Sequence, residues 1–119
     1  MRIMIVDDNI DAAESLSDLL ELEGHQVEIF LSGESAVAAY SESEFQIVIT
    51  DMKMPGIGGV EAIRQIKAIN KNASVIVISG NTVREDLEEV SGLGIKALFR
   101  KPYDVNELIH RVHQESLSG

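Results

Sequence analysis

The chain has 119 residues, of which 45% are hydrophobic and 25% charged, a composition typical of one soluble globular domain. Its 20 acidic and 10 basic residues give a formal net charge of −10, so we expect no unaided binding to nucleic acid or to an anionic membrane, since both require a positive protein surface. No apolar run approaches the roughly 20 residues of a membrane helix. No signal-peptide pattern follows Met1, and the absence of cysteine excludes disulfides and thiolate metal sites, as in a typical cytoplasmic protein.

Five segments have the hydrophobic pattern of β-strands. Residues 3–6, 47–49 and 75–78 are continuously apolar, as expected for strands that are covered on both faces. Residues 26–30 alternate in polarity for most of their length, and residues 96–100 are flanked by cations, as expected for edge strands. Central first, third and fourth strands with second and fifth edge strands favour a doubly wound parallel sheet of order 2-1-3-4-5.

Helical patterns follow each of these strands. Ser32 and Asp104 are expected to cap the second and fifth helices. Thr82 and Glu85 form a capping box before the fourth helix, and Gly24 marks the end of the first. The apolar residues at helical spacing are Ala12, Ala13, Leu16, Leu19 and Leu20; Ala36, Val37 and Tyr40; Val60, Ile63 and Ile66; Val83, Leu87 and Val90; and Val105, Leu108, Ile109 and Val112. The alternation predicts a single α/β domain with the (βα)5 flavodoxin-like fold.

Polar side chains stand where the predicted strands end. Asp7 and Asp8 follow the first strand, and Asp51 follows the third. Ser79 follows the fourth strand and Lys101 the fifth. Because the first and third strands are neighbours in this order, we expect the three aspartates to converge in the crevice at the carboxyl edge of the sheet. Ser79 and Lys101 would enter the same crevice from its other side.

Three carboxylates in one crevice repel one another. Two unit charges about 4 Å apart repel by about 4 kcal/mol at an effective dielectric constant of about 20. Lys101 supplies one positive charge, which does not balance three negative ones. Either one carboxylate stays protonated or a divalent cation binds. An all-oxygen cluster suits a hard ion, so the pattern favours Mg²⁺ held by Asp7 and Asp8 with open positions for phosphate oxygens.

These groups together predict a phosphoryl-accepting site. Asp51 would be the nucleophile that forms an aspartyl phosphate. The metal would neutralise oxygens of the transferred group, and Lys101 would place a point charge on another oxygen. Ser79 would donate its hydroxyl to a phosphoryl oxygen, and Gly80 leaves room for the group.

Four segments carry a resemblance to a known family: Ile5–Asn9, Ile49–Gly56, Ser79–Gly80 and Lys101–Tyr103. They resemble the response-regulator receiver domain, the CheY-like phosphoacceptor of two-component signalling. The resemblance spans almost the whole chain and implies one receiver domain over residues 1–119. Residues 114–119 are expected to be a frayed tail or the start of a linker.

The resemblance also implies a role for each site residue. It implies that Asp51 is the phosphoacceptor, that Ser79 is the switch hydroxyl and that Lys101 contacts the phosphate. It further implies a cis peptide bond between Lys101 and Pro102. The implied ligands of Mg²⁺ are Asp7, Asp8, Asp51 and the backbone carbonyl of Lys53.

One position departs from the family pattern. Receivers usually carry Tyr or Phe three positions before the lysine, and this chain has Leu98 there. In the family that aromatic ring is thought to swing inward as the switch hydroxyl moves. Phe99 and Tyr103 are the neighbouring aromatic residues that could take its place.

The expected donor is the phosphohistidine of a histidine kinase or of a histidine phosphotransfer protein. The expected output is a protein that binds the face formed by the fourth helix, the fifth strand and the fifth helix. The domain would catalyse its own phosphorylation and slow dephosphorylation without being a turnover enzyme. Two alternatives stay open at this point: a receiver-shaped adaptor that needs no phosphate, which the intact acidic set disfavours, and a phosphohydrolase, which would have an Asp-x-Asp pattern after the first strand.

Overall fold

The computed structural model describes residues 1–80 and 83–118. All of its paired strands are parallel and follow the order β2-β1-β3-β4-β5, which confirms the predicted topology. The strands are β1 (Arg2–Val6), β2 (Gln26–Phe30), β3 (Ile47–Asp51), β4 (Ser74–Ser79) and β5 (Ala97–Arg100). The predicted strands are thus confirmed, with small differences at their ends.

Helices alternate with the strands along the chain. The helices are α1 (Ile10–Leu22), α2 (Gly33–Glu42), α3 (Gly58–Ile69), α4 (Val83–Val90) and α5 (Val105–Ser118). Residues 114–118, expected as a tail, continue α5, and the extent of the domain stays a prediction. In the described part of the chain, no helix combines the length and the apolar character that a membrane crossing requires.

Polar side chains cap the amino-terminal ends of α1 and α2. Ser32 accepts a hydrogen bond from the Ser35 amide at 3.1 Å at the start of α2, as predicted. Asn9 caps α1 in the same way, with its Oδ1 3.2 Å from the amide nitrogen of Ala12. Thr82, the first residue of the predicted capping box, lies outside the described residues.

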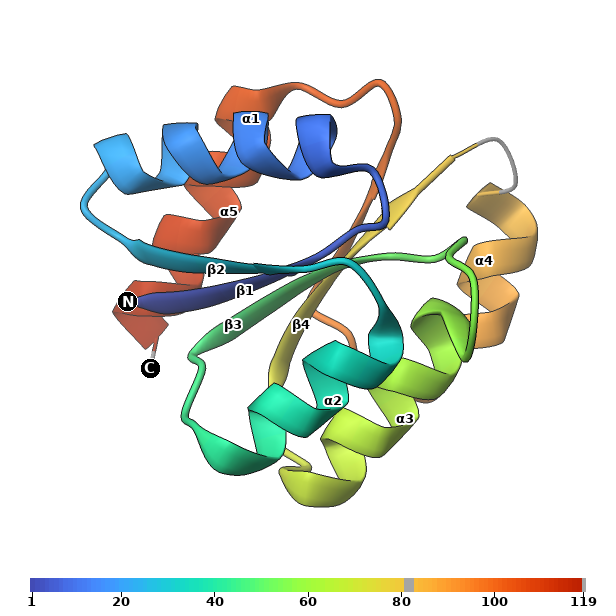
Figure 1. Ribbon diagram of the computed structural model, residues 1–119. Coiled ribbons are helices and arrows are strands. Elements are labelled where there is room, and N and C mark those ends of the chain that lie inside the picture. Colours follow the sequence, from blue (N-terminus) through green and yellow to red (C-terminus); the bar gives the residue numbers. More distant parts are fainter. Residues whose placement is uncertain (81–82, 119) are drawn as a thin grey trace.

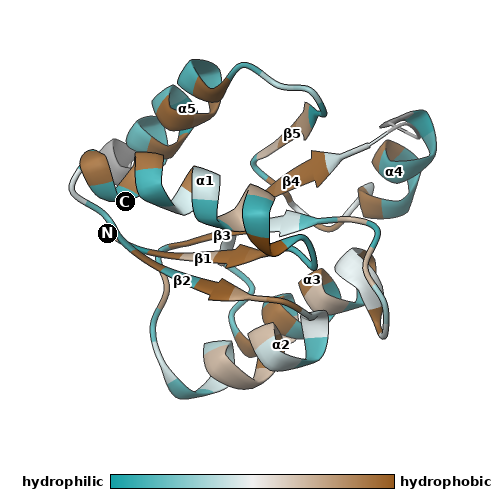
Figure 2. Ribbon diagram, turned by 45° about the horizontal axis from the view of Figure 1, so that its top comes forward, coloured by the Kyte–Doolittle hydropathy of each residue, from teal (hydrophilic) through white to brown (hydrophobic). Residues whose placement is uncertain are grey.

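The sheet is covered by helices on both faces. Figure 1 shows α1 and α5 on one face and α2, α3 and α4 on the other. Because successive strand residues point to opposite faces, Ile3 and Ile5 pack toward α1 and α5, whereas Met4 and Val6 pack toward α2 and α3. The strands are mostly hydrophobic, and the helices carry both hydrophobic and hydrophilic residues (Figure 2).

The strand register brings the residues of the candidate site close together. Val6 is paired with Thr50, so the residues that follow them, Asp7 and Asp51, lie side by side at the carboxyl edge of the sheet. Asp51 is in turn paired with Ile78, which places Ser79 one residue further along β4. The central strands that carry these residues are almost entirely buried, so the polar groups stand on a rigid support.

Three described positions of the helical patterns, Ala12, Leu19 and Leu87, are exposed. On α1 the buried stripe consists of Ala13, Leu16, Ser17 and Leu20, so Leu19 lies beside it and is 37% exposed. On α4 the predicted inward position of Leu87 is wrong, because Leu87 is 49% exposed and Asp86 is fully buried. Asp86 is buried because it accepts a hydrogen bond from the Ser79 hydroxyl.

Gly59 permits the close approach of α3 to the end of β3. A Cβ atom at this position would lie 2.4 Å from the backbone oxygen of Asp51 and 2.8 Å from the Cα atom of Met52. We expect Gly59→Ala to lower the free energy of unfolding by about 1–3 kcal/mol, since backbone atoms must move to relieve the overlap. Urea denaturation measures this change. The matched control is Gly80→Ala, because a Cβ atom there meets nothing within 4 Å; an equal loss in both variants would contradict the argument.

Candidate functional site

Three aspartates form an acidic cluster at the carboxyl edge of the sheet. Asp7, Asp8 and Asp51 each offer a carboxylate oxygen, and these oxygens lie within 4.8 Å of one another. Asp7 and Asp51 are buried at the ends of the central strands β1 and β3, whereas Asp8 is exposed. The cluster therefore has an inner side held by the sheet and an outer side open to solvent.

Backbone amides orient the two buried carboxylates. Oδ1 of Asp7 accepts a hydrogen bond of 2.9 Å from the Asn9 amide, and Oδ1 of Asp51 accepts one of 2.7 Å from the Met52 amide. The second oxygen of each carboxylate faces Lys101, whose Nζ lies 3.1 Å from Oδ2 of Asp51 and 3.8 Å from Oδ2 of Asp7. Each carboxylate thus has one oxygen fixed by the backbone and one turned toward a cation.

The position of Lys101 is set by the end of β5. Its amide donates a 2.7 Å hydrogen bond to the carbonyl oxygen of Ser79, which keeps the chain beside β4 after the last strand pair. The Lys101–Pro102 peptide bond is cis, as predicted. Lys101 therefore enters the cluster from the side opposite to β1.

The cluster perturbs the protonation of its members. Burial raises the pKa of Asp7 above its ordinary value of 3.8, and the charges of Asp51 and Asp8 act in the same direction against the Asn9 hydrogen bond and Lys101. Burial by itself lowers the pKa of Lys101, but its hydrogen bond to Asp51 and the charges of Asp51 and Asp7 give a net increase. The site therefore carries more negative charge than one lysine balances, so it favours an added cation.

Asp7 is expected to lower the stability of the metal-free protein at neutral pH. Folding raises the pKa of Asp7, so protonation of Asp7 stabilises the folded state. This stabilisation is complete below pH 3.8 and is lost as the pH rises through the raised pKa. Asp7→Asn should therefore increase the free energy of unfolding at pH 7 in EDTA, on the order of 1 kcal/mol. Urea denaturation at several pH values measures the difference, which should shrink toward acid pH.

Asp8→Asn is the control for this prediction. Asp8 belongs to the same cluster but is exposed, so the same substitution should change stability less. Lower stability of Asp7→Asn than of the unchanged chain in EDTA at pH 7 would contradict the electrostatic argument.

The donor set fits a hard divalent ion. All three carboxylates offer oxygen. Burial, together with the charges of Asp51 and Asp8, raises the pKa of Asp7, and a bound cation would offset this cost of its ionised form. Lys53 is exposed and follows the buried Met52, the first residue after β3. The role predicted for its backbone carbonyl as a further metal ligand stays a prediction.

Ser79 makes a contact that the sequence did not reveal. It is fully buried at the end of β4, and its Oγ donates a 2.5 Å hydrogen bond to Oδ2 of Asp86 on α4. A single aspartate in an acidic amphipathic helix is ordinarily assigned to the solvent face, so hydrophobic periodicity contained no signal for this contact. Ser79 is thus bonded toward α4 in this structure.

The residues near Leu98 lie on different faces of the sheet. Leu98 packs with the core on the α2, α3 and α4 side, whereas Phe99 and Tyr103 belong to the core beneath α1 and α5. The rings of Phe99 and Tyr103 lie 6.3 Å apart at an angle of 59°. Neither aromatic residue therefore occupies the side of the sheet on which Leu98 stands.

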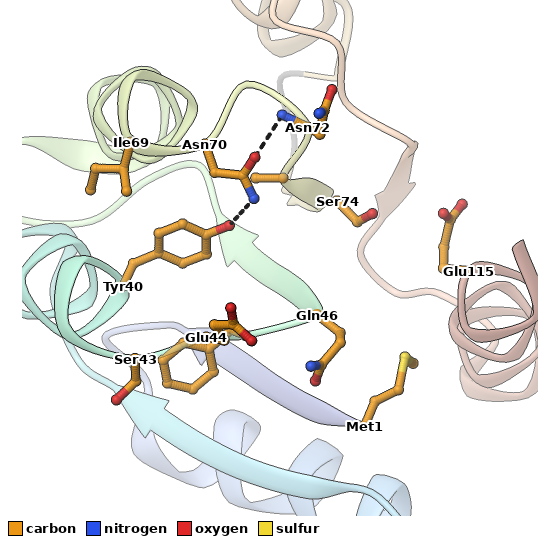
Figure 3. Close-up of a pocket in the computed structure, with 12 residues that line it drawn as sticks. Met1, Tyr40, Ser43, Glu44, Gln46, Ile69, Asn70, Asn72, Ser74 and Glu115 are labelled. Atoms are coloured by element: carbon orange, nitrogen blue, oxygen red, sulfur yellow. Dashed lines mark hydrogen bonds between the residues drawn. The ribbon is translucent and has the colours of Figure 1, made fainter. Parts of the chain in front are cut away.

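One cavity lies at the carboxyl ends of the strands and another at their amino ends. A cavity of about 420 Å³ at the carboxyl edge is lined by Asp7, Asp51, Lys101 and Tyr103, among others. A second cavity, of about 520 Å³, lies at the amino edge (Figure 3). There Asn70 donates a 3.2 Å hydrogen bond to the hydroxyl of Tyr40. None of the predicted site residues lines this second cavity.

Comparison with known proteins identifies the family. The family model of the response regulator receiver domain matches residues 3–113. A transcriptional regulatory protein of Haemophilus influenzae, a CpxR homologue, is 35% identical over 113 residues, which cover 93% of this chain and 48% of that protein. Sporulation initiation phosphotransferase F of Bacillus subtilis is 30% identical over 107 residues, which cover 90% of this chain and 86% of that protein.

The solved structures agree with these relatives. The crystal structure of a response regulator receiver protein from Pseudomonas putida has a TM-score of 0.89 and 30% sequence identity, and 95% of each chain is covered. The chain spans less than half the length of some curated relatives. For example, it covers 48% of the Haemophilus influenzae protein. The shared region contains the sheet and the acidic cluster described above. This chain therefore belongs to the family of response regulator receiver domains, the signalling domains of two-component systems.

Proposed function

We propose that Asp51 accepts a phosphoryl group from a phosphohistidine donor and that the modified domain changes its affinity for a protein partner. The observation that carries this proposal is the geometry around Asp51. Its carboxylate stands at the end of a buried central strand, inside the acidic cluster and 3.1 Å from the Lys101 ammonium. A carboxylate in such a setting is a nucleophile with cationic support for the incoming oxygens.

The reaction is a displacement at phosphorus. An oxygen of Asp51 forms an O–P bond as the N–P bond of the phosphohistidine breaks. The leaving imidazole nitrogen keeps the electron pair of that bond and takes up a proton from solvent. Lys101, already paired with Oδ2 of Asp51, lies where its charge can stabilise an oxygen of the transferred group. The backbone amide of Met52 holds Oδ1 of Asp51 in place.

Asp7, Asp8 and Asp51, with the backbone carbonyl of Lys53, would hold Mg²⁺. When bound, the ion supplies positive charge that offsets the charges of the aspartates and of the phosphoryl oxygens. The oxygen-only donor set and the raised pKa of Asp7 support this assignment. Ser79 would then donate its hydroxyl to the phosphoryl group.

The partners follow from this chemistry. The donor would be a histidine kinase or a histidine phosphotransfer protein in the cytoplasm. The output would be a protein that recognises the face formed by α4, β5 and α5. The domain itself would catalyse only its phosphorylation and a slow dephosphorylation. The net charge of −10 supports a protein partner rather than direct binding to nucleic acid or to a membrane.

Acetyl phosphate tests the proposal directly. We expect the chain to gain one phosphoryl group in the presence of Mg²⁺, as measured by intact-protein mass spectrometry, and to gain none in EDTA. Hydroxylamine should remove the group, because an acyl phosphate reacts with this nucleophile. Absence of phosphoryl uptake from both acetyl phosphate and a phosphorylated histidine phosphotransfer protein would favour the phosphorylation-independent adaptor instead.

A further inference from the structure

Asp86 is a buried carboxylate that lies outside the acidic cluster. Asp86 on α4 and Ser79 on β4 are both 0% exposed, and the Ser79 hydroxyl donates to Oδ2 of Asp86 at 2.5 Å. Distances of about 2.5–2.7 Å are typical of a hydroxyl that donates to a carboxylate, and such charge-assisted bonds are stronger than neutral ones. This bond therefore ties the end of β4 to α4 in the interior of the protein.

The Ser79 hydroxyl has two possible acceptors but one proton. It can donate to a single acceptor at a time. Ser79 directly follows Ile78, the residue that is paired with Asp51 in the sheet. A phosphoryl group on Asp51 would add strong acceptor oxygens beside this position. The phosphoryl group and Asp86 would therefore compete for the same proton.

The pattern of buried and exposed side chains on α4 indicates how this competition would change the structure. Among the described side chains of the helix, residues 84–90, Asp86 and Val90 are buried, whereas Leu87 is 49% exposed. Neighbouring helix residues are about 100° apart, so a rotation of that size exchanges Asp86 for Leu87 at the sheet surface. Leu87 and Val90 are three residues apart and can share one face. Loss of the Ser79 hydrogen bond disfavours burial of the carboxylate and favours burial of leucine.

We propose that Asp86 is a positioning residue that holds the Ser79 hydroxyl away from Asp51 in the unphosphorylated domain, and that release of this hydrogen bond turns Leu87 of α4 toward the sheet. The inference rests on the proposed function, because it requires a phosphoryl group at Asp51. Figure 1 shows α4 near the carboxyl end of β4, the strand that ends at Ser79. The exposure of residue 87 then reports the state of the switch.

A single introduced cysteine makes this exposure measurable, since the chain contains none of its own. In Leu87→Cys, the rate of labelling by a thiol reagent should fall at least about fivefold when Mg²⁺ and beryllium fluoride, a mimic of the phosphoryl group, are added. Glu89→Cys, at an exposed position of the same helix, is the control, and its labelling rate should change less. An unchanged labelling rate at position 87 would overturn the inference.

Asp86→Asn tests the residue itself. The amide keeps the shape of the side chain but removes the charge from the hydrogen bond. Beryllium fluoride should bind this variant about tenfold more tightly than the unchanged chain. Combined with Leu87→Cys, it should slow thiol labelling at position 87 even without the mimic. In a Ser79→Ala background, Asp86→Asn should have no effect on binding. Glu89→Gln is the matched control for the loss of one carboxylate from α4.

The outcomes separate this inference from the proposed function. If Asp86 merely supports the fold, Asp86→Asn should loosen α4 and accelerate thiol labelling at position 87, which overturns the inference. If beryllium fluoride raises the melting temperature of the unchanged chain without altering labelling at position 87, the inference fails and the proposed function stands. If beryllium fluoride with Mg²⁺ has no effect on the melting temperature, both fail.

Discussion

Asp51→Asn is expected to abolish phosphorylation by acetyl phosphate in the presence of Mg²⁺. The amide has no anionic oxygen to attack phosphorus, and it removes one of the three carboxylates of the acidic cluster. The fold should persist, because the amide oxygen can still accept the hydrogen bond that Oδ1 of Asp51 receives from Met52. Intact-protein mass spectrometry measures the phosphoryl gain directly.

Asp18→Asn is the matched control for this experiment. Asp18 is an exposed aspartate of α1 that lies outside the acidic cluster, so its substitution should leave phosphoryl uptake unchanged. Uptake by Asp51→Asn at the rate of the unchanged chain would show that another residue is the nucleophile. Loss of uptake in both variants would point to a general effect of the substitution rather than to the site.

Ile63→Ala is expected to cause the largest loss of stability among the substitutions considered. Ile63 is 0% exposed on α3 and belongs to the core between α3 and the sheet. Truncation of a fully buried isoleucine to alanine costs about 2–5 kcal/mol, because it removes apolar burial and leaves a cavity. Domains of this kind typically unfold with about 5–15 kcal/mol, so the loss is a large fraction of the total. Urea denaturation measures it.

Ile69→Ala provides the comparison on the same helix. Ile69 is 48% exposed at the end of α3, so the same chemical change should cost less than about 1 kcal/mol. An equal loss in the two variants would mean that α3 does not pack on the sheet as described. A smaller loss for Ile63→Ala than for Ile69→Ala would contradict the assignment of the core face.

The amino-acid sequence by itself predicted the fold and the main chemistry of the site. Continuous apolar strands and amphipathic helices report burial directly, so their alternation led to the order β2-β1-β3-β4-β5. The positions of Asp7 and Asp51 directly after central strands then implied that they meet, because parallel strands end at one edge of the sheet. These inferences depend on local pattern and on topology, and both can be read along the chain.

Tertiary structure alone decided which side chains of α4 are buried and what holds Ser79. Hydrophobic periodicity places Leu87 inward and an aspartate outward, whereas in the structure Asp86 is buried and Leu87 is exposed. The reason is a hydrogen bond between residues seven positions apart on different elements, and no sequence pattern encodes a polar contact of that kind. The approach of Lys101 to Asp51, 50 positions earlier in the chain, likewise acquires its 3.1 Å geometry only when the sheet is assembled.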